Sequence, residues 1–236
     1  MSKSPANYGH RQDGFFTERL SEALGDPLFA DELVDWYMRV FNDQTEGEWA
    51  ENWTPELARQ KLLIDTAGQH DQTIINGWRD NGQLAGVMIG YLDRVDRVIH
   101  LTDLPPGFQT AKKLAELNSH LEWLMGTDAL VVQYRELGII RQHRQGTAVF
   151  RIFADAAKAA VDAGVRYGCW WTSRNSRVYQ IDVGLGCHLA YDFHDPQQIV
   201  LMYTEGDQFL RRVTQSPGRM RQMMAARVAN LEPQKP

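Results

Sequence analysis

The sequence contains little cysteine, and its two cysteines do not form a metal-binding motif. Cys169 and Cys187 lie beside Trp170 and Leu185, which indicates buried thiols in a reducing compartment. No Cys-x-x-Cys pair occurs, and the seven histidines form no His-x-His or His-x-x-x-His pair. A metal site built from thiolates or clustered imidazoles is therefore not expected, and we predict no bound metal.

Long apolar runs and a basic excess are also missing. No apolar run approaches the roughly 20 residues that a membrane-spanning helix needs. The N-terminal stretch MSKSPANYGHRQDG has no signal-like apolar core. With 25 basic against 30 acidic side chains, the net charge is −5, which argues against a broad nucleic-acid-binding surface. We expect a cytoplasmic protein that binds neither membranes nor nucleic acid.

The 236 residues, of which 43% are hydrophobic, are sufficient for a substantial core. Without repeats or an evident linker, we predict one domain over residues 1–236. Its core would span about 57–203, residues 1–14 would be flexible, and residues 207–231 would form a C-terminal helix rich in Arg and Met. That helix would be either a solvated face or a contact in a homodimer.

The spacing of apolar residues changes along the chain from helical to strand-like. Helical spacing predicts helices over residues 17–24, 30–41, 110–125, 149–164 and 174–183, and Thr54-Pro55-Glu56 has the composition of a further helix start. Strand-like patterns occupy residues 72–78, 84–91, 131–140, 166–172, 189–193 and 199–203. Asp80-Asn81-Gly82 joins the first two strands as a hairpin. Antiparallel pairs with one parallel crossover indicate the α+β class.

The most informative segment is the strand, basic turn and helix from Val131 to Gly164. The turn contains Arg141, His143 and Arg144, and Gly146 lies just before the helix start. A helix N-terminus offers unpaired N–H groups and partial positive charge, and glycine lets an anion approach the backbone closely. The segment therefore predicts a phosphate-binding turn.

Four motifs in this order resemble the GNAT superfamily of acyl-CoA-dependent N-acyltransferases. His143-Arg144-Gln145-Gly146-Thr147-Ala148 is similar to the family's phosphate loop, Gln/Arg-x-x-Gly-x-Gly/Ala. The other three motifs are the hairpin GWRDNGQLAGVMIGY, Asn175 after a later strand, and Leu185-Gly186-Cys187. The resemblance covers about residues 57–203. It implies a mixed, mostly antiparallel sheet flanked by helices, with extra N- and C-terminal helices, and acetyl-CoA or another acyl-CoA as co-substrate.

The resemblance also implies which residues bind the cofactor. Backbone N–H groups from Arg144 to Ala148 would hold the pyrophosphate, with Arg141 on phosphate oxygens, and an amide at Ile139 or Ile140 would polarise the thioester carbonyl. Asn175 would either contact the cofactor or cap the following helix. The predicted cofactor-binding residues are Ile139, Ile140, Arg141, His143, Arg144, Gln145, Gly146, Thr147, Ala148 and Asn175.

Candidate catalytic residues are Glu136, Tyr134 and Tyr179. Glu136 lies within a central strand, where it would either form an ion pair with Arg151 or Arg166 or act as a general base. Strand alternation places Tyr134 on the same face, either in the core or at the site. Where the family often has a general-acid tyrosine, this chain has Asp182, so Tyr179 one helical turn earlier would substitute.

Trp170 and Trp171 are consecutive in a strand and would point to opposite faces, in the core or with one lining an acceptor pocket. The resemblance implies direct transfer of an acyl group from acyl-CoA to a primary amine. An acyl-carrier-protein-dependent N-acyl amino acid synthase and an inactive CoA-binding module are the alternatives. An aminoglycoside, a polyamine, an amino acid and a protein amine are all acceptable as acceptors at this point.

Overall fold

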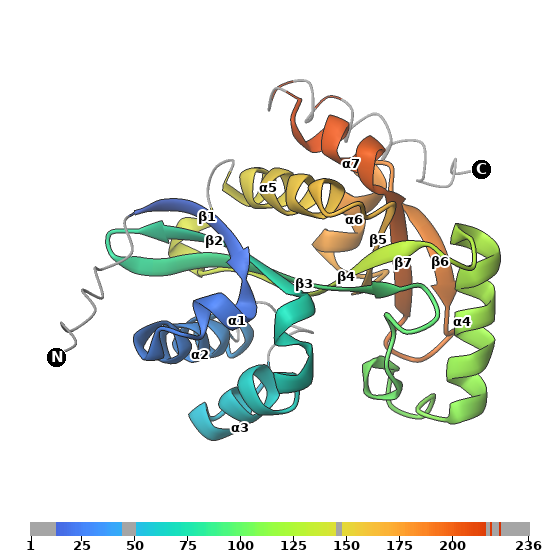
Figure 1. Cartoon of the computed structure of the whole chain (residues 1–236), viewed down its shortest axis with the longest axis horizontal. Coiled ribbons are helices and arrows are strands. Elements are labelled where there is room, and N and C mark those ends of the chain that lie inside the picture. Colours follow the sequence, from blue (N-terminus) through green and yellow to red (C-terminus); the bar gives the residue numbers. More distant parts are fainter. Residues whose placement is uncertain (1–12, 44–50, 145–147, 216–217, 219–221, 223–236) are drawn as a thin grey trace, which may run out of the picture.

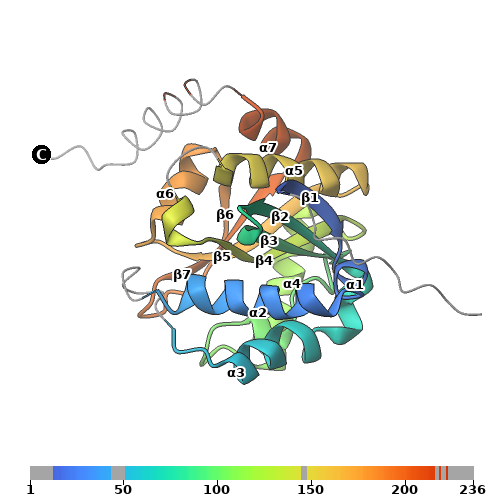
Figure 2. The same ribbon diagram turned by 90° about the vertical axis from the view of Figure 1, so that its left-hand side faces the viewer.

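The computed structural model describes residues 13–43, 51–144 and 148–215, together with residues 218 and 222. These residues form a seven-stranded sheet in the order β1-β2-β3-β4-β5-β7-β6, with helices on both faces (Figures 1 and 2). All neighbouring strands are antiparallel except β4 and β5, which are parallel. The strands are β1 (Gly14–Arg19), β2 (Thr73–Asp80), β3 (Gln83–Arg94), β4 (Leu130–Ile139), β5 (Tyr167–Ser173), β6 (His188–Asp192) and β7 (Ile199–Glu205).

The helices divide between the two faces of the sheet. On one face α5 (Ala148–Asp162), α6 (Arg177–Gly184) and α7 (Gly206–Val213) pack over a core that includes Ile152, Trp170 and Phe209. The other face is covered at one end by α1 (Leu20–Ala23), α2 (Pro27–Phe41) and α3 (Pro55–Arg59), and at the other end by α4 (Ala111–Met125). Figure 1 shows α3 and α4 apart on this face. Within the described ranges, none of the helices combines the length and apolar character that a bilayer crossing needs.

Local sequence signals account for several of these elements. Thr54 caps α3 by accepting from the Leu57 N–H, with Pro55 at the first helical position, as predicted. At the β2–β3 hairpin, Asn81 and Gly82 both have positive φ, the conformation that such tight turns require. Cys169 and Cys187 are both buried, as predicted.

The first predicted helix is wrong over residues 17–19. Gly14–Arg19 is the edge strand β1, whose side chains alternate between half-buried and exposed along its pairing with β2. Only Leu20–Ala23 is helical. Of the predicted C-terminal helix over 207–231, the structure shows α7 (Gly206–Val213), which ends at the C-cap Thr214. Most residues beyond 215 and residues 1–12 lie outside the described ranges.

A bulge in β4 and a divergence from β5 set the geometry of the sheet's centre. The β3–β4 register shifts between the pairs Ile89–Glu136 and Gly90–Tyr134, so Arg135 is an extra residue in β4. Parallel pairing between β4 and β5 ends at Tyr134 and Trp170, and beyond that point the two strands separate. The centre of the sheet therefore opens into a wedge, and α5 begins just after the end of β4.

The bulge also corrects the predicted orientation of two side chains. Tyr134 packs with Trp170 on the α5 face, whereas Glu136 lies on the α2–α3 face near Lys61. An extra residue reverses the alternation of a strand, because side chains point to opposite faces with a period of two. The prediction that Tyr134 and Glu136 share a face is therefore wrong.

Candidate active site

The wedge between β4 and β5 is lined by backbone groups of the second half of β4. The Ile140 N–H, one of the two predicted oxyanion donors, donates to the carbonyl oxygen of Ala85 on β3 (2.9 Å), so this amide is already engaged within the sheet. The Ile139 carbonyl instead accepts from Arg144 Nε (2.7 Å). Since N–H and C=O of one strand residue point to the same side, the Ile139 N–H faces the wedge. It is the better placed of the two predicted oxyanion donors.

The basic turn after β4 is fixed to neighbouring elements through two of its side chains. His143 Nδ1 lies 3.2 Å from Asp80 Oδ2, and its ring contacts Trp78 edge-to-face. The Arg144 guanidinium lies 3.5 Å from the Asp43 carboxylate, while Arg141 is exposed. Ala148 is the first residue of α5. The predicted contacts of Gln145, Gly146 and Thr147 lie outside the described residues.

Glu136 is paired with a residue that sequence reasoning missed. Lys61 Nζ lies 2.7 Å from Glu136 Oε1 and also donates to the Tyr37 hydroxyl (2.6 Å). Lys61 follows directly from α3, in the short π-helical segment Gln60–Ile64. The predicted ion-pair partners are wrong: Arg151 pairs with Asp155 on α5, and the guanidinium of Arg166 lies over the Tyr167 ring.

Burial changes the proton affinity of this cluster. It raises the pKa of the Glu136 carboxyl above its usual range, and this effect exceeds the opposite effect of the Lys61 charge. The pKa of the Tyr37 hydroxyl is also raised, by burial and by the negative charge of Glu136. A carboxyl group with a raised pKa, next to an opening in the sheet, is suited to accept a proton near neutral pH.

A cavity of about 480 Å³ lies on the same face, beside Glu136. Its polar walls come from the segment after α3, from the loop before α4, and from β4 and β5. The polar and aromatic side chains that argue for a binding site are Lys61, Asp103, Gln133, Arg135, Glu136 and Trp171. Trp171 therefore lines the cavity. A position in the core was the alternative that the sequence left open.

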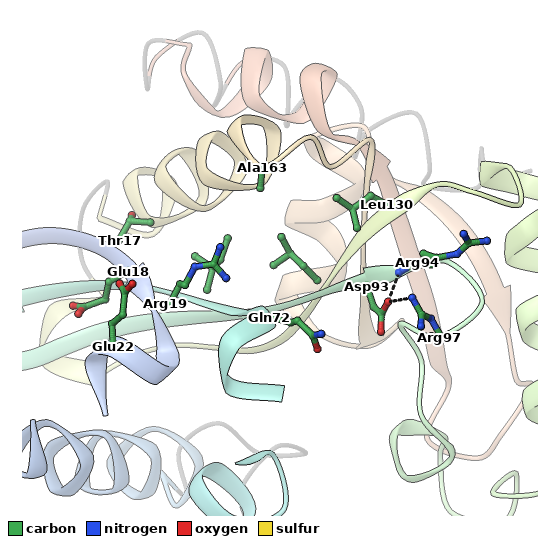
Figure 3. Close-up of a pocket in the computed structure, with 12 residues that line it drawn as sticks. Thr17, Glu18, Arg19, Glu22, Gln72, Asp93, Arg94, Arg97, Leu130 and Ala163 are labelled. Carbon is green, nitrogen blue, oxygen red and sulfur yellow. Dashed lines mark hydrogen bonds and ion pairs between the residues drawn. The ribbon is translucent and has the colours of Figure 1, made fainter. Parts of the chain in front are cut away.

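A second hollow, of about 580 Å³, lies elsewhere on the molecule (Figure 3). It is bordered by β1, by Leu130 at the start of β4 and by Ala163 just after α5, and the ion pair between Asp93 and Arg97 closes one side. The wedge opens at the other end of β4. This hollow contains none of the residues that the sequence predicts for catalysis or cofactor binding.

The other predicted side chains lie on the α6 side of the sheet. Tyr134 is buried against Trp170, and burial raises its pKa. The Tyr179 hydroxyl accepts from Arg174 Nη1 (3.2 Å). Asn175 is exposed, and α6 is capped by Ser176, so the capping role considered for Asn175 is wrong.

Asp182, at the position where the family often has tyrosine, is buried in α6. Its Oδ2 accepts from the indole N–H of Trp170 at 2.8 Å. Burial raises the pKa of Asp182 to about 7, although the Trp170 hydrogen bond acts in the opposite direction. Asp182, Tyr134 and Tyr179 thus lie on the α5–α6 face of the sheet. Glu136 and Lys61 lie on the opposite face.

Comparisons with protein-family models and with curated proteins found no match. Solved structures, in contrast, match the fold of this chain. A CoA-dependent acyl-homoserine lactone synthase, BjaI, with SAM and isopentyl-CoA, has a TM-score of 0.57 and 12% identity over 89% of this chain and 90% of its own. This protein has the GNAT fold.

Two further GNAT-fold structures support the same conclusion. The PaiA N-acetyltransferase from Thermoplasma acidophilum, in complex with coenzyme A, has a TM-score of 0.51 and 12% identity over 81% of this chain and 98% of its own. A mutant agmatine N-acetyltransferase has a TM-score of 0.52 and 13% identity, over 81% of this chain and 99% of its own. The predicted α+β class, with a mostly antiparallel sheet flanked by helices, is confirmed for this GNAT-fold protein.

Proposed function

We propose that this protein is a CoA-dependent N-acyltransferase that transfers an acetyl or longer acyl group to an amine. The observation that carries the proposal is the wedge between β4 and β5, which opens beside a cavity containing Glu136. The GNAT fold supports it, because the structures named above include a CoA-dependent synthase and an N-acetyltransferase in complex with coenzyme A.

The acyl donor would lie along the wedge. Its pantetheine arm would follow the second half of β4, where the Ile139 N–H would donate to the thioester carbonyl and stabilise an oxyanion. The pyrophosphate would be held at the N-terminus of α5 by backbone amides from Arg144 to Ala148, with Arg141 as an exposed cation nearby. Asn175, exposed after β5, would contact the same cofactor.

The acceptor amine would enter from the cavity on the Glu136 side. Its nitrogen would attack the thioester carbonyl carbon, an amide bond would form, and the carbon–sulfur bond would break. Glu136 would take the proton that the amine loses, directly or through water. The leaving thiolate would receive a proton, for which we propose Tyr179 as the donor. Holding both substrates in one site would supply much of the rate enhancement.

Calorimetry with acetyl-CoA and octanoyl-CoA, followed by thiol release with a panel of amines, tests this function. We expect binding of at least one thioester and amine-dependent release of free CoA. Binding without release across the panel would favour an inactive CoA-binding module. No heat with either thioester, together with acyl transfer from acyl carrier protein, would replace CoA with the carrier as donor.

Substitution of Gly146 tests the phosphate turn separately. Gly146→Glu is expected to weaken CoA binding at least tenfold, because it would bring a carboxylate against the pyrophosphate. The matched control is Gly68→Glu, because a Cβ added at Gly68 meets no atom within 4 Å. This variant should bind CoA with wild-type affinity. Equal CoA affinity of the two variants, measured by calorimetry, would show that the turn does not hold the phosphates.

A further inference from the structure

Two residues that line the cavity each carry a buried N–H donor that has no partner among the described residues. The side-chain NH₂ group of Gln133 and the indole N–H of Trp171 are both shielded from solvent, and neither has a hydrogen-bond partner in the described part of the chain. Gln133 is fully buried. Buried donors are nearly always satisfied in folded proteins, since an unpaired one carries a free-energy cost. Two such donors in one cavity point to a ligand that supplies oxygen acceptors.

The neighbouring Arg135 fixes which end of the Gln133 amide is available. Its Nε donates to Gln133 Oε1 at 2.9 Å, and because a guanidinium can only donate, the amide NH₂ must be the group left over. Arg135 is itself largely buried, bonded to Gln69 and to Asp103 (3.3 Å), and lies over the Tyr91 ring. The cavity wall thus presents an oriented NH₂ group beside a fixed cation.

Strand register places these donors beside the proposed reacting centre. Gln133 and Cys169 are a register pair of β4 and β5, and Trp171, two residues after Cys169, points to the same face where the strands begin to separate. The Arg135 bulge turns Glu136 to that face as well. The donors and the proposed base therefore line one cavity.

We propose that the acceptor carries a carboxylate as well as its amine, as an amino acid does. The carboxylate oxygens accept from Gln133 and Trp171 next to the Arg135 cation, and the amine faces Glu136. The charges of the cavity suit such a zwitterion, because Lys61 and Arg135 are cationic and Glu136 and Asp103 are anionic. This inference rests on the proposed function, which leaves the acceptor open.

The test compares amino acids with their decarboxylated amines as acceptors. Initial rates of thiol release would be measured with acetyl-CoA or octanoyl-CoA and both members of each pair. We expect kcat/KM to be at least tenfold higher for one or more amino acids than for the matching amines. Equal or higher values for the amines throughout would overturn this inference while leaving the acyltransferase proposal intact.

Gln133→Glu is the most direct variant, because it keeps the acceptor for Arg135 and replaces the NH₂ donor with a carboxylate oxygen. It should lower kcat/KM for the amino acid at least tenfold and change that for the amine much less. Arg135→Gln, at a less buried position, should also lower the ratio of kcat/KM for the amino acid to kcat/KM for the amine. It is the alternative test if Gln133→Glu folds poorly. Arg97→Gln, in the other hollow, is the control and should leave the ratio unchanged.

Calorimetry with amino acids in the absence of CoA separates the two proposals. Amino-acid binding that is weakened by Gln133→Glu supports the carboxylate site even if no CoA thioester binds. An unchanged ratio of amino acid to amine in both Gln133→Glu and Arg135→Gln would overturn the carboxylate site, whatever the fate of the acyl transfer.

Discussion

Glu136→Gln is expected to lower kcat roughly 10²–10⁴-fold while leaving acyl-CoA binding unchanged. Glutamine keeps the shape of the side chain and can still accept from Lys61, which lies 2.7 Å from the carboxylate, but it cannot take the proton of the amine. Thiol release under saturating substrates measures the loss. Glu116→Gln on the exposed surface of α4 is the matched control and should keep wild-type turnover.

The pH dependence of turnover distinguishes a base from a structural carboxylate. Because burial raises the pKa of Glu136, the rate should rise with pH through a limb that lies above the usual glutamate range, and this limb should vanish in Glu136→Gln. Equal pH profiles for the wild type and this variant would exclude Glu136 as the base.

Lys61 is a positioning residue in this scheme, and its charge sets where that limb lies. The Lys61 ammonium lowers the pKa of Glu136, so Lys61→Met should move the acid limb of kcat to higher pH. Lys61 also bonds the Tyr37 hydroxyl, and its loss would free both partners. A purely structural lysine would change the rate at all pH values without moving the limb, and that outcome would contradict the assignment.

Much of the fold followed from local signals in the sequence. The Thr54-Pro55 helix start, the Asn81-Gly82 turn and the apolar period of α2 and α5 act over a few residues, so they were readable without tertiary information. The edge strand β1 cannot be predicted in this way, because it is defined by its pairing with β2, a contact between segments distant in sequence. Its residues continue directly into α1, and the local pattern of residues 17–24 alone predicts a single helix.

The site was predictable only in part, since its geometry depends on a bulge and on contacts between distant segments. Glu136 could be selected because a carboxylate inside a central strand is unusual. The pairing of Glu136 with Lys61 could not be predicted, because Lys61 lies in a helical segment distant from Glu136 in sequence. The bulge at Arg135 is defined only relative to β3, so simple alternation misplaced Tyr134. Gln133 reads as an ordinary strand residue until Arg135 and the cavity are located around it.

Asp182→Asn is expected to remove a pH-dependent loss of stability. Burial raises the pKa of Asp182 from an ordinary 3.8 to about 7. Between these values the folded protein binds the proton more tightly than the unfolded chain, so the free energy of unfolding falls as pH rises. The fall is about 1.4 kcal/mol per pH unit and on the order of 4 kcal/mol in total. Asparagine can still accept from Trp170 through its amide oxygen, but it does not titrate.

Urea unfolding of both proteins at several pH values measures the effect. The stability of Asp182→Asn relative to wild type should grow between about pH 4 and pH 7 and then level off, because above pH 7 Asp182 is ionised in both states. Trp170→Phe removes the hydrogen bond that lowers the pKa of Asp182, so it should extend the window to higher pH. Parallel stability curves for all three proteins would show that Asp182 is already ionised in the folded protein, and that its burial is offset by contacts other than Trp170.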